Sequence, residues 1–137
     1  MNIAQFKINS ELKKESIESL CDLMGISSKL GELNWTRNQD FTKDSNYSKQ
    51  AIFAFNGDVY DGLDINSLDN EKHQLVNNII RILSGLYGIL KPFDHIKPYR
   101  LEMGTKFSIN GNKNLYDFWK SKVTNQLKSE LAEDELI

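Results

Sequence analysis

The turn signal that decides the fold lies in residues 83–92. This stretch reads Leu83-Ser84-Gly85-Leu86-Tyr87-Gly88-Ile89-Leu90-Lys91-Pro92. Two glycines flanked by apolar residues permit a tight hairpin, and the backbone N–H groups of such a hairpin point outward. At a helix N-terminus, a turn of this kind binds phosphate without needing a charged side chain. The stretch therefore predicts either a phosphate-binding hairpin or a simple turn from a helix into a strand.

The same stretch resembles the hairpin of helix-hairpin-helix DNA-binding motifs. The glycines of that motif enclose one apolar residue, whereas Gly85 and Gly88 enclose two. A helix is expected before the turn, with Ser67 as its N-cap. Leu75, Ile79 and Leu83 lie along its apolar line and are joined by Val76, Ile80 and Ile82.

Residues 99–107 alternate in the manner of a strand. Tyr99, Leu101 and Met103 point one way, and Arg100, Glu102 and Lys106 point the other. Gly104 leaves open space on the polar side, so Arg100 and Glu102 form either a solvated salt bridge or, with Tyr99 and Thr105, the wall of a polar pocket. Asn110-Gly111 then predicts a tight turn.

Amphipathic helices are expected on both sides of this central region. The first is predicted over Ser10 to Met24, closed by Gly25, with Cys21 as a small core residue. A second begins at Ser27 or Ser28 and carries Leu30 and Leu33 on its buried side, followed by a loop over 38–47. Ser48 opens a short helix that buries Ala51, Ile52 and Phe55. The last helix carries an apolar stripe that we interpret as core: Leu115, Phe118, Trp119, Val123, Leu127 and Leu131.

Composition sets limits on the class of protein. The chain has 137 residues, 39% of them hydrophobic and 10% aromatic, which is enough to bury one core. It has no apolar run of about 18 residues, no signal-peptide pattern at its start and one cysteine, so we expect a cytoplasmic protein without membrane contact. We expect a single domain over 1–137 of mixed α/β class, mainly helical, with a short strand and hairpin region around 97–111.

The net charge of -2 conceals an uneven distribution. Residues 1–71 hold 7 Lys/Arg and 12 Asp/Glu, a balance of -5, whereas residues 72–128 hold 10 Lys/Arg and 3 Asp/Glu, a balance of +7. An acidic helical part followed by a basic part indicates either a surface for a polyanion or solvated helix faces.

Catalytic and metal-binding patterns are weak in this sequence. Asp58, Asp61 and Asp64 lack the spacing of a calcium loop, so capping and turn roles are the better interpretation. His73 and His95 are isolated and are expected at the surface. No nucleophile–base pair is visible, so we predict no metal and no cofactor and do not favour an enzyme.

Four ordered blocks between Phe55 and Trp119 resemble the YaaA-type peroxide-stress proteins. They are the hairpin block continued to Asp94, together with Phe55-Asn56-Gly57-Asp58-Val59-Tyr60, Pro98-Tyr99-Arg100-Leu101-Glu102-Met103-Gly104-Thr105-Lys106 and Asn114-Leu115-Tyr116-Asp117-Phe118-Trp119. The resemblance implies a cytosolic bacterial protein that is induced by hydrogen peroxide, limits free intracellular iron and binds DNA through a basic cleft and a helix-hairpin-helix element. It implies DNA-binding roles for Gly85, Gly88, Lys91, Lys97, Arg100 and Lys106. The alternative is a small-molecule-binding protein or enzyme that uses the pocket around Tyr99, Glu102 and Thr105.

Two departures from the family are visible. Family members begin with a strand and a Ser-Pro-Ala-Lys-like segment that this chain lacks, and they continue past Glu135-Leu136-Ile137. We therefore expect this chain to be a fragment, or a truncated relative, of a larger mixed α/β fold.

Overall fold

The computed structural model describes residues 3–43 and 47–131. Within these ranges the chain forms seven α-helices, one 3-10 turn and four short strands, which confirms the expected mixed α/β class. The elements are α1 (Ala4–Leu12), α2 (Ile17–Met24), α3 (Ser28–Asp40), β1 (Lys49–Gln50), α4 (Ala51–Ala54), α5 (Asp58–Leu63), η1 (Ile65–Ser67), α6 (Asn70–Ile79), β2 (Ile82–Ser84), β3 (Gly88–Leu90), β4 (His95–Ile96) and α7 (Leu115–Leu131). The predicted interruption at 135–137 and part of the predicted 38–47 loop lie outside the described residues.

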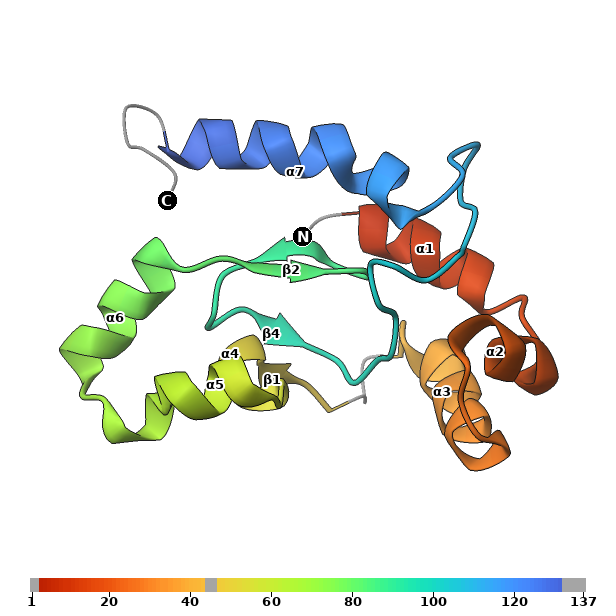
Figure 1. Ribbon diagram of the computed structural model, residues 1–137, viewed down its shortest axis with the longest axis horizontal. Coiled ribbons are helices and arrows are strands. Elements are labelled where there is room, and N and C mark those ends of the chain that lie inside the picture. Colours follow the sequence, from red (N-terminus) through yellow and green to blue (C-terminus); the bar gives the residue numbers. More distant parts are fainter. Residues whose placement is uncertain (1–2, 44–46, 132–137) are drawn as a thin grey trace.

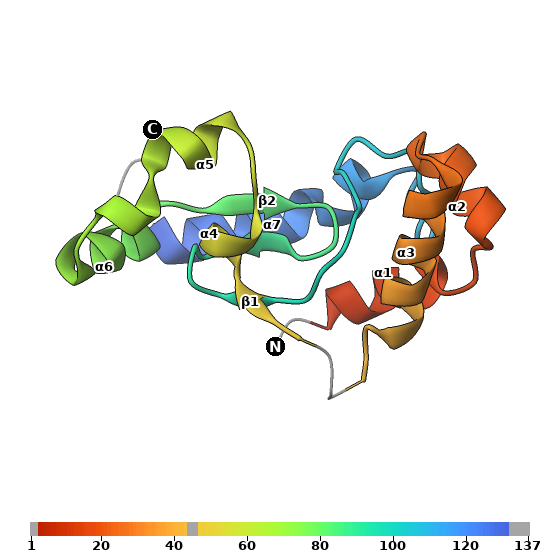
Figure 2. The ribbon, with the colours of Figure 1, turned by 90° about the horizontal axis from the view of Figure 1, so that it is seen from below.

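The strands occupy the middle of the molecule and the helices surround them. Figure 1 shows α1, α2 and α3 gathered at one end, α5 and α6 at the other, and α7 along one side. The turned view of Figure 2 shows the same division, with the chain between β4 and α7 running toward α2. The main core joins these parts and includes Ile8, Leu12, Leu20, Leu86, Leu115 and Phe118.

The single helix predicted over residues 10–24 is wrong, because the chain forms two helices there. Ser16 restarts the helix, since its side-chain oxygen accepts a hydrogen bond from the backbone N–H of Ser19. The predicted cap Ser10 lies inside α1. Gly25 ends α2 in the left-handed conformation, as expected.

The predicted buried face of α3 is also wrong. Ser27 caps the helix as predicted, but the helix continues to Asp40, and its buried residues are Gly31, Asn34 and Asn38. Gly31 lets α3 approach α2 closely, because a Cβ atom there would lie 2.3 Å from Sγ of Cys21. Close packing through a glycine therefore replaced packing through Leu30 and Leu33, which stay exposed.

Backbone pairing with a later segment decides where α4 begins. β1 pairs antiparallel with β4, and the N–H groups of Ala51 and Ile52 donate to the carbonyls of Asp94 and Pro92, both at 2.8 Å. Gln50 rather than Ser48 precedes the helix for this reason. Ala51 and Ile52 are buried, as predicted, and Phe55 is half-buried.

Helix α6 begins later than predicted, and of the predicted apolar residues Val76 and Ile82 are buried. Asp69 caps it through the N–H of Lys72, whereas Ser67 ends the 3-10 turn before it. Val76 packs in a second small core with Ile52 and Ile65. The predicted apolar line is exposed instead, at 54% for Leu75, 68% for Ile79 and 65% for Leu83.

The glycine turn joins two strands rather than two helices, so the predicted helix-hairpin-helix arrangement is not formed. β2 pairs antiparallel with β3, with Ile82 opposite Leu90 and Ser84 opposite Gly88. The indole N–H of Trp119 in α7 donates to the carbonyl of Gly85 at 2.8 Å and holds α7 over the hairpin.

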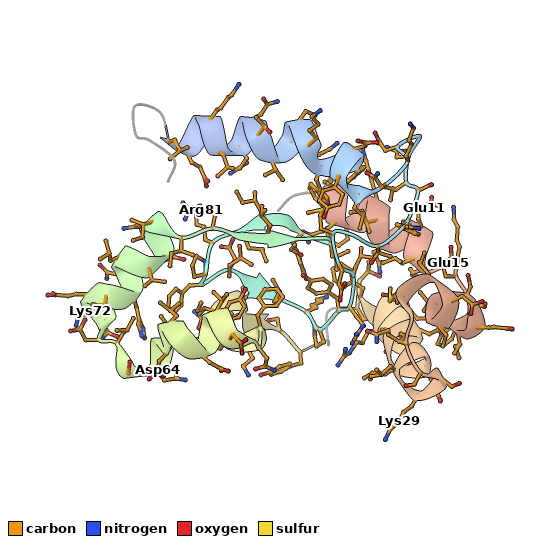
Figure 3. All side chains as sticks on the ribbon, viewed as in Figure 1. Glu11, Glu15, Lys29, Asp64, Lys72 and Arg81 are labelled. Atoms are coloured by element: carbon orange, nitrogen blue, oxygen red, sulfur yellow. The ribbon has the colours of Figure 1, made fainter. Side chains whose placement is uncertain are left out.

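The predicted strand around 97–111 does not form a ladder. Residues 97–108 lead from β4 toward α7 without regular secondary structure. They turn at 103–105, where the N–H of Thr105 donates to the carbonyl of Glu102 at 3.0 Å. The one bridge in this region joins Ile109 to Asn112. That bridge closes the predicted Asn110-Gly111 turn, in which both residues have positive φ. Arg81, labelled in Figure 3 where α6 meets β2, forms an ion pair at 3.0 Å with Glu130 near the end of α7.

Candidate functional site

The predicted site residues gather on residues 96–106, which run from the end of β4 through the turn at 103–105 and which we call the extended segment. This segment borders two hollows, one lined by residues 96–99 and the other by residues within 100–106. A buried polar network fixes the beginning of the segment. The hydroxyl of Tyr87 accepts the backbone N–H of Lys97 at 3.0 Å, and the side-chain oxygen of Ser84 accepts the N–H of Tyr87 at 3.0 Å.

Tyr99 completes this network from the extended segment. Its hydroxyl shares a hydrogen bond with the Ser84 side chain, and its ring packs against Tyr87 with centroids 5.5 Å apart. Burial raises the pKa of Tyr99 to about 12, and the Ser84 hydrogen bond offsets part of that effect. Burial also raises the pKa of Tyr87. Both phenols therefore stay protonated at neutral pH and can donate hydrogen bonds.

The larger hollow has a volume of about 770 Å³ and lies between α2 and the extended segment. The extended segment contributes Arg100, Glu102 and Lys106, which the alternation predicted on one polar face, and also Thr105. Helix α2 contributes Ser19, Asp22, Leu23 and Met24. We term it the α2 pocket. Glu102 and Thr105 line it as the predicted polar pocket requires, whereas Tyr99 does not.

The smaller hollow has a volume of about 250 Å³ and lies along the start of the segment, residues 96–99. Tyr99 lines it together with Phe55, Tyr47 and the basic side chains Arg37 and Lys49. The residues predicted to share one pocket are therefore divided between two hollows, because successive stretches of the chain line them: Tyr99 belongs to the stretch 96–99, and Glu102 and Thr105 belong to the stretch 100–106.

The hairpin glycines are placed where no ligand reaches them. Gly85 and Gly88 are buried. A Cβ atom on Gly85 would lie 2.3 Å from the carbonyl oxygen of Leu101, and one on Gly88 would lie 2.5 Å from the Trp119 ring. These glycines permit close packing of the hairpin, and the prediction of an outward-facing phosphate turn is not met by this geometry.

The predicted DNA-binding cations fall into two groups. The ammonium of Lys97 donates to the carbonyls of Phe41 at 2.6 Å and Lys43 at 3.1 Å, so this side chain anchors the end of α3. Lys91, Arg100 and Lys106 are exposed. Within the described residues, the side chains of these three make no hydrogen bond or ion pair.

Of the two histidines predicted at the surface, one is exposed and one is half-buried. In the described residues no three His, Cys, Asp or Glu side chains converge as metal ligands, and this includes Asp58, Asp61 and Asp64. His73 is half-buried rather than at the surface, because its Nε2 atom bonds the carbonyl of Ile65 at 2.8 Å. His95 is exposed, as expected.

Over 3–43 and 47–131, no helix has the length and apolar character needed to cross a membrane.

Comparison with known proteins assigns the family. The model of the family described as "Peroxide stress protein YaaA" matches residues 3–137, nearly the whole chain. The chain belongs to the YaaA family of peroxide stress proteins. Membership confirms the resemblance carried by the four sequence blocks.

Similar YaaA-family relatives come from several bacterial groups. A UPF0246 protein of Acaryochloris marina is 50% identical over 131 residues, which are 93% of this chain and 52% of that protein. One from Flavobacterium psychrophilum is 51% identical over 132 residues, with 95% and 52% covered. One from Neisseria meningitidis serogroup B is 46% identical over 127 residues, with 90% and 48% covered. The chain thus spans about half the length of these relatives.

Sequence reasoning did not find the contribution of α2 to the larger hollow. Ser19 and Asp22 lie more than 75 positions before Arg100 along the chain, and nothing in the local pattern connects them. The one available signal was the polarity of residues 19 and 22 beside the apolar stripe of α2. Arg37 and Lys49 were likewise absent from the predicted site.

Proposed function

We propose that this chain serves the peroxide-stress response by binding DNA through the exposed cations of its basic part. The observation that carries the proposal is the lack of charge compensation in residues 72–128. Of the ten Lys and Arg side chains there, only Arg81 has a carboxylate partner among the described residues. Unpaired surface cations produce a positive potential that attracts a polyanion.

The binding surface that we propose contains Lys91, Arg100 and Lys106. All three are exposed, and each can contact a phosphate without first breaking a bond within the described protein. Contacts to phosphates carry no sequence information, so we expect similar affinity for different sequences. Lys97, Gly85 and Gly88 are left out of this surface, because their atoms are engaged within the fold.

A lowered level of free iron is the second part of the proposal. The side chain of Cys21 bonds the carbonyl of Ser27 at 3.5 Å, and His73 bonds the carbonyl of Ile65 at 2.8 Å. The Cys21 sulfur and the His73 imidazole are therefore engaged with the backbone in separate places. This favours an indirect effect on iron, through other cellular proteins, over storage by the described residues.

The proposal is tested by fluorescence anisotropy of this chain with duplex and bubble-containing DNA over a salt series. The double variant Lys91→Glu/Arg100→Glu is expected to weaken binding at every sequence and to reduce the slope of log affinity against log salt by about 2. The matched control is Lys13→Glu/Lys29→Glu, which changes the net charge equally on exposed positions of the acidic part. Equal losses in the two variants would show that bulk charge, rather than the proposed surface, sets the affinity. No binding by the folded chain would reject DNA binding by this half of the fold.

A further inference from the structure

The α2 pocket has the size of a small-molecule site and a lining that is mostly polar. Its volume of about 770 Å³ falls within the range of about 300–1,000 Å³ that such sites occupy. Its two walls come from separate parts of the chain: α2 on one side, and the extended segment 100–106 on the other. Figure 2 shows this segment reaching α2 on its way from β4 to α7.

Four ionisable side chains line the pocket without being paired. Arg100 and Lys106 are cationic, Asp22 and Glu102 are anionic, and all four are exposed. Within the described residues, none of the four side chains forms an ion pair or a hydrogen bond, even though opposite charges border the same hollow. Each of them is therefore available to a ligand, and the protein would not have to break an internal bond to bind it.

The balance of these charges distinguishes between classes of ligand. Two cations and two carboxylates give the lining no net charge, so the two carboxylates weaken, without abolishing, the attraction of Arg100 and Lys106 for a phosphate backbone. A ligand that carries both a carboxylate and an ammonium satisfies both signs. The guanidinium of Arg100 matches a carboxylate with two parallel hydrogen bonds, and Asp22 and Glu102 accept hydrogen bonds from an ammonium.

We propose that the α2 pocket binds a free amino acid with an apolar side chain. Arg100 and Lys106 receive its carboxylate, Asp22 and Glu102 receive its ammonium, and the side chains of Leu23 and Met24 supply an apolar wall. This site goes beyond DNA binding, because a dipolar ion and a polyanion respond in opposite ways to the pocket carboxylates.

The first test uses isothermal titration calorimetry of the whole chain with three probes of similar shape. Leucine carries both charges, 4-methylpentanoate lacks the ammonium, and leucinamide lacks the carboxylate. Leucine is expected to bind, and each analogue is expected to bind at least about tenfold more weakly. No binding of millimolar leucine by the folded chain overturns the proposal, and so does equal affinity for all three probes.

The second test fills the pocket. Gly104 lines it, has no left-handed backbone angle, and meets only the Tyr116 hydroxyl at 3.8 Å from a Cβ position. Gly104→Phe is therefore expected to fold and to lose leucine binding. The matched control is Gly62→Phe in α5, where a Cβ has nothing within 4 Å and no strain. Unchanged leucine affinity in a folded Gly104→Phe variant overturns the placement of the site.

The third test separates this site from the proposed DNA surface. The double variant Asp22→Asn/Glu102→Gln removes both carboxylates and keeps the side-chain shapes. It is expected to weaken leucine binding at least about tenfold, and to strengthen DNA binding because two like charges leave the neighbourhood of the phosphates. A loss of both activities, or of neither, contradicts the proposal.

Discussion

The packing of Trp119 on Gly88 allows a graded test of the structure. Gly88 has a φ of +79°, and a Cβ atom there would lie 2.5 Å from Cζ3 of the Trp119 ring. The ring cannot move away easily, because its indole N–H is bonded to the carbonyl of Gly85 at 2.8 Å. Gly88→Ala therefore combines a left-handed backbone with overpacking of a buried ring.

Two other glycines separate these contributions. Gly111 has nearly the same φ, +82°, but a Cβ there has nothing within 4 Å. Gly104 has neither a left-handed φ nor a close neighbour. We expect Gly104→Ala to change the free energy of unfolding by less than about 0.5 kcal/mol. Gly111→Ala should lower it by about 1–2 kcal/mol through backbone strain alone. Gly88→Ala should lower it by a further 1–3 kcal/mol, roughly, through overpacking.

The assay is urea unfolding of the wild-type chain and the three variants, followed by far-ultraviolet circular dichroism. This signal reports backbone structure, so a changed environment of Trp119 does not distort it. Equal slopes of free energy against urea are needed for a direct comparison. Equal losses for Gly88→Ala and Gly111→Ala would refute the contact between the hairpin and α7.

Three further predictions concern stability. Burial raises the pKa of Tyr99 in the folded state to about 12, above its usual 10.0. The contribution of the protonated phenol to the free energy of unfolding is therefore complete below pH 10 and is lost as the pH rises through about 12. The free energy of unfolding should decline by about 2–3 kcal/mol between pH 10 and pH 12. Urea unfolding at a series of alkaline pH values measures this decline, which should be less steep in Tyr99→Phe. Lys97→Met keeps the aliphatic stem but loses the bonds to Phe41 and Lys43. This substitution should lower the urea midpoint, because the free energy of unfolding falls by about 1–3 kcal/mol, and it should leave the affinity for DNA unchanged. Weaker DNA binding by this variant would show that Lys97 belongs to the DNA-binding surface. Glu130→Gln should lower the free energy of unfolding by about 1 kcal/mol or less and should speed hydrogen exchange at the end of α7, because it removes the ion pair with Arg81. Unchanged exchange would argue against this ion pair.

Local signals predicted those parts of the site whose geometry depends on neighbouring residues. The alternation in residues 99–106 placed Arg100 and Glu102 together on an exposed polar side, and the structure confirms that both line one hollow. The same pattern did not reveal that Tyr99 lines a different hollow or that Lys97 bonds the end of α3. Those outcomes depend on contacts with residues more than 40 positions away.

The hairpin shows where a correct turn signal did not determine what covers the turn. Two spaced glycines did mark a tight turn. Whether its amides face a ligand or the core depends on what covers it, and here Leu101 and Trp119 lie where a Cβ atom on Gly85 or Gly88 would be. No property of residues 83–92 alone specifies those neighbours.

The sequence by itself determined the features that depend on a few adjacent residues. Ser27 and Gly25 bound their helices, Asn110-Gly111 forms its turn, and Leu115, Phe118 and Trp119 face the core. The tertiary structure decided which apolar faces are buried, as in α3, where Gly31 rather than Leu33 meets its neighbour. It also decided which distant segments meet, as when β1 pairs with β4 and α2 completes a pocket with residues 100–106. Caps and turns are short-range hydrogen-bond and backbone preferences, whereas burial depends on how well surfaces from distant segments fit together.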